Sequence, residues 1–270
     1  MAGSFLDTTV IIDIADKTVP GKARAEACIT ANRPAEAPYY ALRELLAGHV
    51  QILCDSHNVI AAAANHAEAL LALLNRSPAE GRKREAKLLA LSTSLKCIFD
   101  VNPSGDRLYL KRELLQSLAL RVTGLWRRAH NLNAVGMVQF LGCFNDGTIS
   151  YGLSGELRGP RNSFNCIKSE RCAAAAYLYD NKNYLKKMID ALHPTRLDSS
   201  VANKTEIQQR RKALKELVSK GPSAFHKGRC RALGDAYFAA MCPAGSDVVT
   251  TNIQDHLPLC LALGKRAITP

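Results

Sequence analysis

The sequence lacks the features that mark membrane, secreted and disulfide-bonded proteins. No apolar run reaches the roughly 18 residues that a membrane-spanning helix needs. The N-terminus has neither the basic region nor the long apolar stretch of a secretory signal, so we expect a cytoplasmic protein without a membrane partner. The nine cysteines are scattered and include no C-x-x-C pair. This spacing favours reduced structural thiols over disulfides or a zinc site.

Motifs for nucleotide, zinc and aspartyl-phosphate chemistry are also missing. Neither G-x-x-x-x-G-K-[ST] nor G-x-G-x-x-G occurs, which excludes the common phosphate-binding loops. The seven histidines include no close pair with the spacing of zinc ligands. A phosphatase with an aspartate nucleophile would carry a second aspartate two residues after Asp7, but Thr9 stands there.

The composition that is present fits a basic globular protein. Of the 270 residues, 47% are hydrophobic and 22% are charged, as in proteins that bury an ordinary core. The length suits one large domain or a domain with a sizeable insertion. The formal net charge of +12 favours a polyanionic partner, nucleic acid first and an anionic membrane surface second.

Residues 4–13, SFLDTTVIID, form the most informative stretch. The apolar run is typical of a strand buried on both faces of a parallel sheet. In open α/β sheets ligands bind at the carboxyl ends of strands, where Asp7 would then face the functional crevice. Alternatively, Asp7 or Thr8 is the N-cap of a helix that follows. The stretch alone leaves both interpretations open.

Helical patterns separated by proline and glycine breaks fill most of the remaining chain. They predict helices over residues 10–18, 22–32, 41–75, 81–99, 106–131, 169–180, 183–192, 205–220, 231–241 and 257–263. Short strands are predicted over 36–40 and 247–251, with a loop over 252–256. An Asn-Asp-Gly turn at 145–147 indicates a hairpin or an irregular loop between 138–141 and 148–153. The polar, basic segment 155–168 is either a substrate-facing loop or a flexible connector.

Four acidic residues at ends or first turns of predicted elements are the candidate catalytic and metal-binding residues: Asp7, Glu44, Asp235 and Asp255. Parallel strands joined through helices bring such positions together. Carboxylates in one crevice repel one another unless a cation holds them. Oxygen-rich sites suit Mg²⁺ or Mn²⁺, which activates water and stabilises charge on a phosphodiester. Taken singly, each residue has a plainer interpretation as a helix cap or a surface carboxylate.

The surroundings of these acids form four short motifs, at residues 5–11 (FLDTTVI), 42–48 (LRELLAG), 234–240 (GDAYFAA) and 247–256 (DVVTTNIQDH). With these motifs in this order, the chain resembles the PIN-domain family of PIN-like metal-dependent nucleases. The resemblance covers the two ends of the chain. It does not extend to the long middle region, and His256 stands where the family often has an aromatic residue.

The resemblance implies a single domain, a three-layer α/β/α sandwich with a central parallel sheet. Its core would be residues 1–58 and 226–270, with a mainly helical insertion at 60–225. The acids implied to hold Mg²⁺ or Mn²⁺ are Asp7, Glu44 and Asp235. Asp255 would complete the site, with Asn252 as a competitor, and the hydroxyls of Thr8 and Thr251 would orient the carboxylates or a water.

The function that we predict is metal-dependent endonucleolytic cleavage of RNA, either by the toxin of a toxin–antitoxin pair or by a housekeeping RNA-processing enzyme. Local charge marks four residues as candidates for holding the RNA backbone: Arg158, Arg161, Lys168 and Arg171. Besides RNA, an inhibitory antitoxin and a second copy of the chain are candidate partners. The alternative is a non-catalytic RNA-binding or scaffold protein on the same fold, in which the basic helices carry the function.

Overall fold

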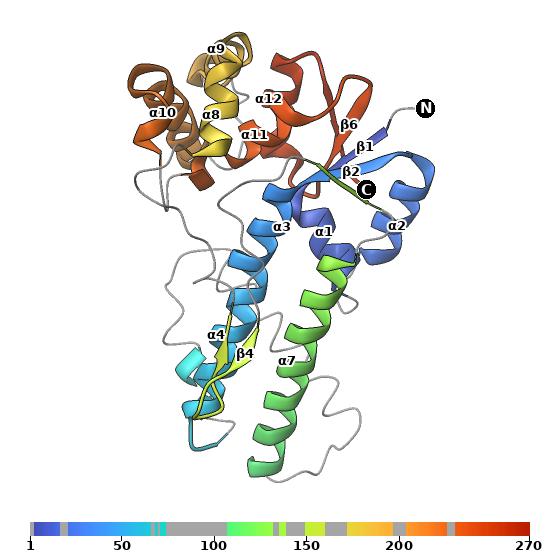
Figure 1. The fold of residues 1–270 in the computed structure, drawn as a ribbon, viewed down its shortest axis with the longest axis vertical. Coiled ribbons are helices and arrows are strands. Elements are labelled where there is room, and N and C mark those ends of the chain that lie inside the picture. The colour runs from blue at the N-terminus through green and yellow to red at the C-terminus, as the bar shows by residue number, and fades with distance from the viewer. Residues whose placement is uncertain are drawn as a thin grey trace.

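A five-stranded parallel sheet forms the centre of the computed structural model, which describes residues 3–16, 21–65, 68–69, 71–73, 107–131, 135–138, 149–159, 172–196, 204–225 and 230–270. Its strands are β1 (Gly3–Leu6), β2 (Ala35–Pro38), β3 (Gly136–Val138), β6 (Ser246–Val249) and β7 (Arg266–Ile268). They lie in the order β3-β2-β1-β6-β7, and each neighbouring pair is parallel. Helices flank this sheet (Figure 1), which confirms the predicted α/β class.

The two central strands have the continuous apolar sequence of strands covered on both faces. Phe5 and Leu6 of β1 are fully buried, as are Val248 and Val249 of β6. The first strand is shorter than the predicted segment 4–13, since it ends at Leu6 and α1 (Thr8–Ala15) begins two residues later. The second half of that apolar run is therefore the buried face of a helix.

The other helices of the described residues are α2 (Lys22–Ala31), α3 (Tyr39–Leu45), the π-helix η1 (Leu46–Val50), α4 (Gln51–Ala62), α7 (Arg107–His130), α8 (Ala173–Asp180), α9 (Lys182–Ala191), α10 (Lys204–Lys220), α11 (Gly234–Met241) and α12 (Ile253–Ala262), with 3-10 turns η3 (Pro194–Arg196), η4 (Pro222–Ala224) and η5 (Cys230–Leu233). Helices α8, α9 and α10 form a group beside α11 and α12. This agrees with the mostly helical character predicted for the middle of the chain, although β3 also comes from that region.

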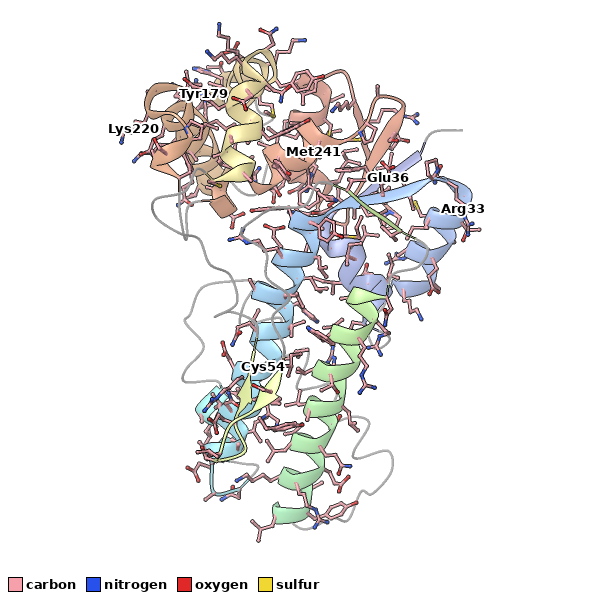
Figure 2. The ribbon with its side chains drawn as sticks, in the orientation of Figure 1. Arg33, Glu36, Cys54, Tyr179, Lys220 and Met241 are labelled. Carbon is pink, nitrogen blue, oxygen red and sulfur yellow. The ribbon has the colours of Figure 1, made fainter. Side chains whose placement is uncertain are left out.

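A helical arm extends from the opposite side of the sheet. In Figure 1, α3, η1 and α4 run one after another away from the sheet, and α7 packs along them. The facing side of α7 carries apolar side chains at helical spacing, and Leu114, Leu118 and Val122 are fully buried. From α4, Cys54 lies inside the arm (Figure 2) and is also fully buried. No helix among the described residues is both long and apolar enough to cross a membrane.

Two local predictions need correction. Residues 252–256, predicted as a loop, include the start of α12, because the helix begins at Ile253. Val138 pairs with Pro38 in the central sheet, so it takes no part in the predicted hairpin. The antiparallel pair in this region joins β4 (Ser150–Tyr151) to β5 (Leu157–Arg158). The predicted helix over 81–99 and the turn at 145–147 lie outside the described residues.

Candidate active site

The candidate site lies where the strand order of the sheet diverges. From β1 the chain continues to β2 on one side, whereas β6 lies on the other side. In open α/β sheets such a switch point leaves a crevice at the carboxyl ends of the strands, where ligands bind. Leu6 pairs with Val249 in the parallel register. Asp7 and Thr250, the next residue of each strand, therefore enter this crevice side by side.

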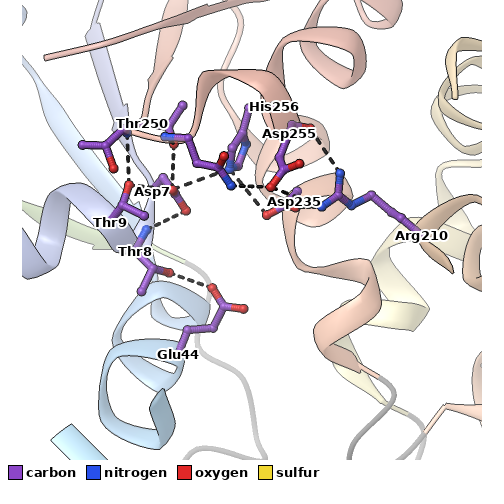
Figure 3. Close-up of polar contacts among 11 residues, drawn as sticks. Asp7, Thr8, Thr9, Glu44, Arg210, Asp235, Thr250, Asp255 and His256 are labelled. Carbon is purple, nitrogen blue, oxygen red and sulfur yellow. Dashed lines mark hydrogen bonds and ion pairs between the residues drawn. The ribbon is translucent and has the colours of Figure 1, made fainter. Parts of the chain in front are cut away.

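Asp7 serves both as the residue at the end of β1 and as the N-cap of α1, so both predicted roles are present. Its Oδ1 accepts a hydrogen bond of 2.7 Å from the Thr8 backbone N–H. Its Oδ2 accepts bonds of 2.8 Å from the hydroxyls of Thr9 and Thr250 (Figure 3). Burial raises the pKa of Asp7, but His256 and these hydroxyls outweigh it and hold the pKa below its ordinary value. The side chain is therefore an ionised, firmly oriented carboxylate.

Glu44 reaches the same place from α3, the helix that follows β2. The Thr8 hydroxyl donates a hydrogen bond of 2.7 Å to Glu44 Oε2, so Thr8 connects the two acids through its backbone and its side chain. On the other side, Glu44 lies against the start of α11. A Cβ added to Gly234 would be 3.1 Å from Glu44 Oε1. Glu44 thus lies between the start of α1 and the start of α11.

His256 lies between Asp7 and Asp235. Its Nε2 is 3.6 Å from Asp7 Oδ2 and 3.5 Å from Asp235 Oδ1. Burial lowers the pKa of His256, but the two carboxylates outweigh it and raise the pKa to about 9. The ring therefore carries a positive charge at neutral pH. Its Nδ1 is buried and has no hydrogen-bond partner among the described residues.

Arg210 of α10 provides the second cation. Its Nη2 donates a hydrogen bond to Asp235 Oδ2 and is 4.0 Å from Asp255 Oδ2. Its Nη1 donates a bond of 3.3 Å to the backbone carbonyl of Asp255. The Asn252 side-chain amide also donates to Asp255 Oδ2, from the residue before α12. The guanidinium therefore joins the first turns of α11 and α12.

Packed aromatic rings hold these helices in place. Tyr40 of α3 lies edge-on to Tyr237 and Phe238 of α11, with ring centroids 5.4 and 5.9 Å apart. Phe238 in turn contacts the His256 ring at 5.9 Å and the Phe5 ring of β1 at 6.4 Å. Such edge-to-face contacts have a defined geometry, so the elements that carry the acids are fixed relative to one another.

The donors at this site are of the kind that Mg²⁺ and Mn²⁺ prefer, because they are carboxylate, hydroxyl and amide oxygens. As the side chains stand, however, no three Asp, Glu, His or Cys residues in the described ranges form a group that could hold a metal ion. Arg210 and His256 pair with the acids instead. The four carboxylates outnumber these two cations, so the cluster keeps a net negative charge. The residue types fit a divalent cation, provided that Arg210 releases Asp235 and Asp255.

The remaining predicted residues lie in different places. The hydroxyls that donate to Asp7 belong to Thr9 and Thr250. Thr251 is exposed, and among the described residues its backbone N–H donates a bond of 3.1 Å to the Thr9 hydroxyl. Arg158 is in β5, which packs on α4 of the arm, and it pairs with Glu156 at 3.0 Å. Among the described residues, the contacts of Arg158 therefore lie on the arm and not at the acid cluster. The other candidates for RNA binding lie outside the described residues: Arg161, Lys168 and Arg171.

Sequence reasoning missed three residues that hydrogen-bond to the acids: Thr9, Thr250 and Arg210. Thr9 and Thr250 adjoin residues that were predicted, so a hydroxyl next to each strand end was a usable signal. Arg210 had no such signal, because it is one of several basic residues in the QQRRKALKE segment. Comparisons of the chain with models of known protein families, with curated proteins and with solved structures found no match. The functional argument therefore uses the fold and the site geometry.

Proposed function

We propose that this protein is a metal-dependent endoribonuclease of the PIN-like type. The observation that supports the proposal most is the convergence of Asp7, Glu44, Asp235 and Asp255 at the switch point of the sheet. These acids come from four separate elements and from positions up to 248 residues apart along the 270-residue chain. If each acid were only a helix cap, nothing would require the four to lie close together. Binding a shared cation does require it.

The charges of the molecule also suit an enzyme that acts on RNA. The chain carries a formal net charge of +12, whereas at this crevice four acids outnumber the two cations, Arg210 and His256. A basic surface attracts the phosphate backbone without regard to sequence. A negative crevice beside it attracts a divalent cation, which in turn binds phosphate oxygens. The basic surface and the acidic crevice are therefore both consistent with metal-dependent cleavage of RNA.

Under this proposal, Asp7, Glu44, Asp235 and Asp255 hold Mg²⁺ or Mn²⁺, with Asn252 orienting Asp255. When bound, the ion supplies a reactive hydroxide from water and offsets the charge on the scissile phosphodiester. The protein's own contribution is orientation. Thr8 sets the separation of Asp7 and Glu44, because it donates to both carboxylates.

A non-catalytic RNA-binding protein is the second candidate function. The observation in its favour is that Arg210 and His256 already neutralise part of the acid cluster. In that case the acids would be structural, and the exposed lysines of α9 and α10 would contact RNA.

The two functions can be separated by incubating the purified protein with a mixed RNA pool, in Mn²⁺ and in EDTA. We expect cuts in Mn²⁺ that disappear in EDTA and with Asp7→Asn. The matched control is Asp190→Asn, which removes an exposed carboxylate on α9 and should cut like wild type. Equal cutting by the Asp7→Asn protein would reveal a contaminant. RNA binding by wild type without any cleavage would favour the second candidate.

A further inference from the structure

Arg210 is a charged residue at a core position of its helix. The buried side of α10 is marked by Ile207, Leu214 and Leu217, which are fully buried, and Arg210 lies on the same stripe at helical spacing. Arg210 itself is only 8% exposed. An apolar residue at this position would serve packing at least as well, since buried ion pairs seldom add net stability. We therefore look for a functional role that explains an arginine at position 210.

The reason is visible in what the guanidinium contacts. It bonds to Asp235 and to the backbone carbonyl of Asp255, and it lies within ion-pair distance of the Asp255 carboxylate. Asp255 is buried, but the Asp235 side chain is 25% exposed. The contact between Arg210 and Asp235 thus lies in a part of the acid cluster that solvent and ions reach.

We propose that Arg210 is the resident counter-ion of the Asp235–Asp255 pair, and that it alternates with the divalent cation at these two carboxylates. The inference rests on the proposed function and adds its regulation. A guanidinium and a divalent cation repel each other and require the same oxygens, so both cannot occupy the pair together. Arg210 therefore holds Asp235 and Asp255 together without the ion, and lowers the affinity of the site for the ion.

The same contact links the site to the helical group. Helix α10 packs against α9 and η5, and Arg211 donates a bond of 3.1 Å to the Ile189 carbonyl of α9. A change in how α10 sits against α11 and α12 would withdraw Arg210 and open the cation site. RNA bound on the exposed lysines of α9 and α10 would act on this helix, which couples substrate binding to ion binding.

The test measures Mn²⁺ affinity of the full chain by isothermal titration calorimetry, with free Mn²⁺ checked by electron paramagnetic resonance. We compare wild type with Arg210→Gln, with Arg210→Lys, and with Arg127→Gln as a control. Arg127 is exposed on α7, outside the helical group, and its substitution makes the same change of residue and charge. We expect Arg210→Gln to bind Mn²⁺ on the order of tenfold more tightly. Arg210→Lys and Arg127→Gln should stay near wild type.

Equal or weaker Mn²⁺ binding by Arg210→Gln would overturn the inference. If this variant does not fold, the guanidinium resonances of wild-type protein labelled with ¹⁵N-arginine provide the answer. The Arg210 signal, assigned with Arg210→Lys, should shift when Mg²⁺ binds, and an unchanged signal at saturating Mg²⁺ would contradict the exchange. If wild type binds Mn²⁺ and cuts RNA without an effect of Arg210, only this inference fails. If no protein binds Mn²⁺, the proposed function fails with it.

Discussion

The Thr250 hydroxyl donates a hydrogen bond of 2.8 Å to the Asp7 carboxylate, and so joins the residues that follow two adjacent parallel strands. Thr250 is fully buried, and Asp7 is 4% exposed. A bond between a buried hydroxyl and an ionised carboxylate is stronger than one between neutral groups. The orientation of the first acid therefore depends on a residue that lies 243 positions away along the chain.

We expect Thr250→Val to lower the free energy of unfolding by about 1.5–3 kcal/mol, because valine keeps the shape but leaves the buried Asp7 charge short of a donor. Chemical denaturation at neutral pH measures the change. Thr250→Ser retains the hydroxyl and should recover most of the loss. Thr251→Val, at the exposed neighbouring position, is the matched control. Similar losses in both valine variants would show that the bond to Asp7 has no special weight.

Gly234, the first residue of α11, lies against Glu44 and Tyr40 of α3. A Cβ there would be 3.1 Å from Glu44 Oε1 and 3.1 Å from the Tyr40 ring. We expect Gly234→Ala to cost about 1–3 kcal/mol of unfolding free energy, because the tightly packed neighbours must move. The control is Gly48→Ala on η1, where an added Cβ meets nothing within 4 Å. Thermal unfolding should show a lower midpoint for Gly234→Ala and not for Gly48→Ala. An unchanged midpoint for Gly234→Ala would mean that Glu44 and Tyr40 can move aside at little cost.

Local sequence patterns were sufficient for the parts of the fold that local physics determines. The helices near residues 22–32, 106–131 and 205–220 were predicted within a few residues of α2, α7 and α10. The apolar runs at Phe5-Leu6 and Val248-Val249 are the buried strands that they indicate. Asp7 was predicted at a strand end or at a helix cap, and it is both because β1 and α1 are separated by this single residue.

Features that depend on contacts between distant segments could not be predicted from the sequence. The start of α12 was missed because Asp255 and His256 are polar yet buried, and the charged residues that they pair with, Arg210 and Asp7, lie on other elements. Arg210 was missed for the same reason, since its charge resembles that of an exposed helix face until α11 and α12 are placed beside it. A single sequence does not contain these pairings in any local pattern.

Because His57 is buried, we expect the folded protein to lose stability in mild acid. The residue is 5% exposed on α4, and burial lowers its pKa below 6.5 despite a hydrogen bond with Asn58. Between the lowered pKa and 6.5 the unfolded chain binds a proton that the folded protein does not, so stability falls as the pH drops through this range. Urea denaturation at pH 7.5 and at pH 5.5 should show a smaller decrease for His57→Gln than for wild type. The same decrease in both proteins would assign the pH dependence to other groups.

Arg121 of α7 links the arm to α1, because it pairs with Asp16, the C-cap of that helix. Its Nη2 and Nε lie 2.7 and 3.1 Å from Asp16 Oδ2, and His49 of η1 is 3.2 Å from the same oxygen. Asp16 has no exposed surface. Removing one partner of a buried pair leaves an uncompensated charge, so Arg121→Gln should cost about 3–5 kcal/mol of unfolding free energy.

The double variant Asp16→Asn with Arg121→Gln separates this pairing from ordinary packing. Once the carboxylate is neutral, the loss of the guanidinium matters less, and the combined cost should be well below the sum of the single costs. Arg127→Gln, at an exposed position of α7, should change stability by no more than about 0.5 kcal/mol. Additive costs in the double variant would mean that Arg121 stabilises the arm through the packing of its alkyl chain and not through its pairing with Asp16.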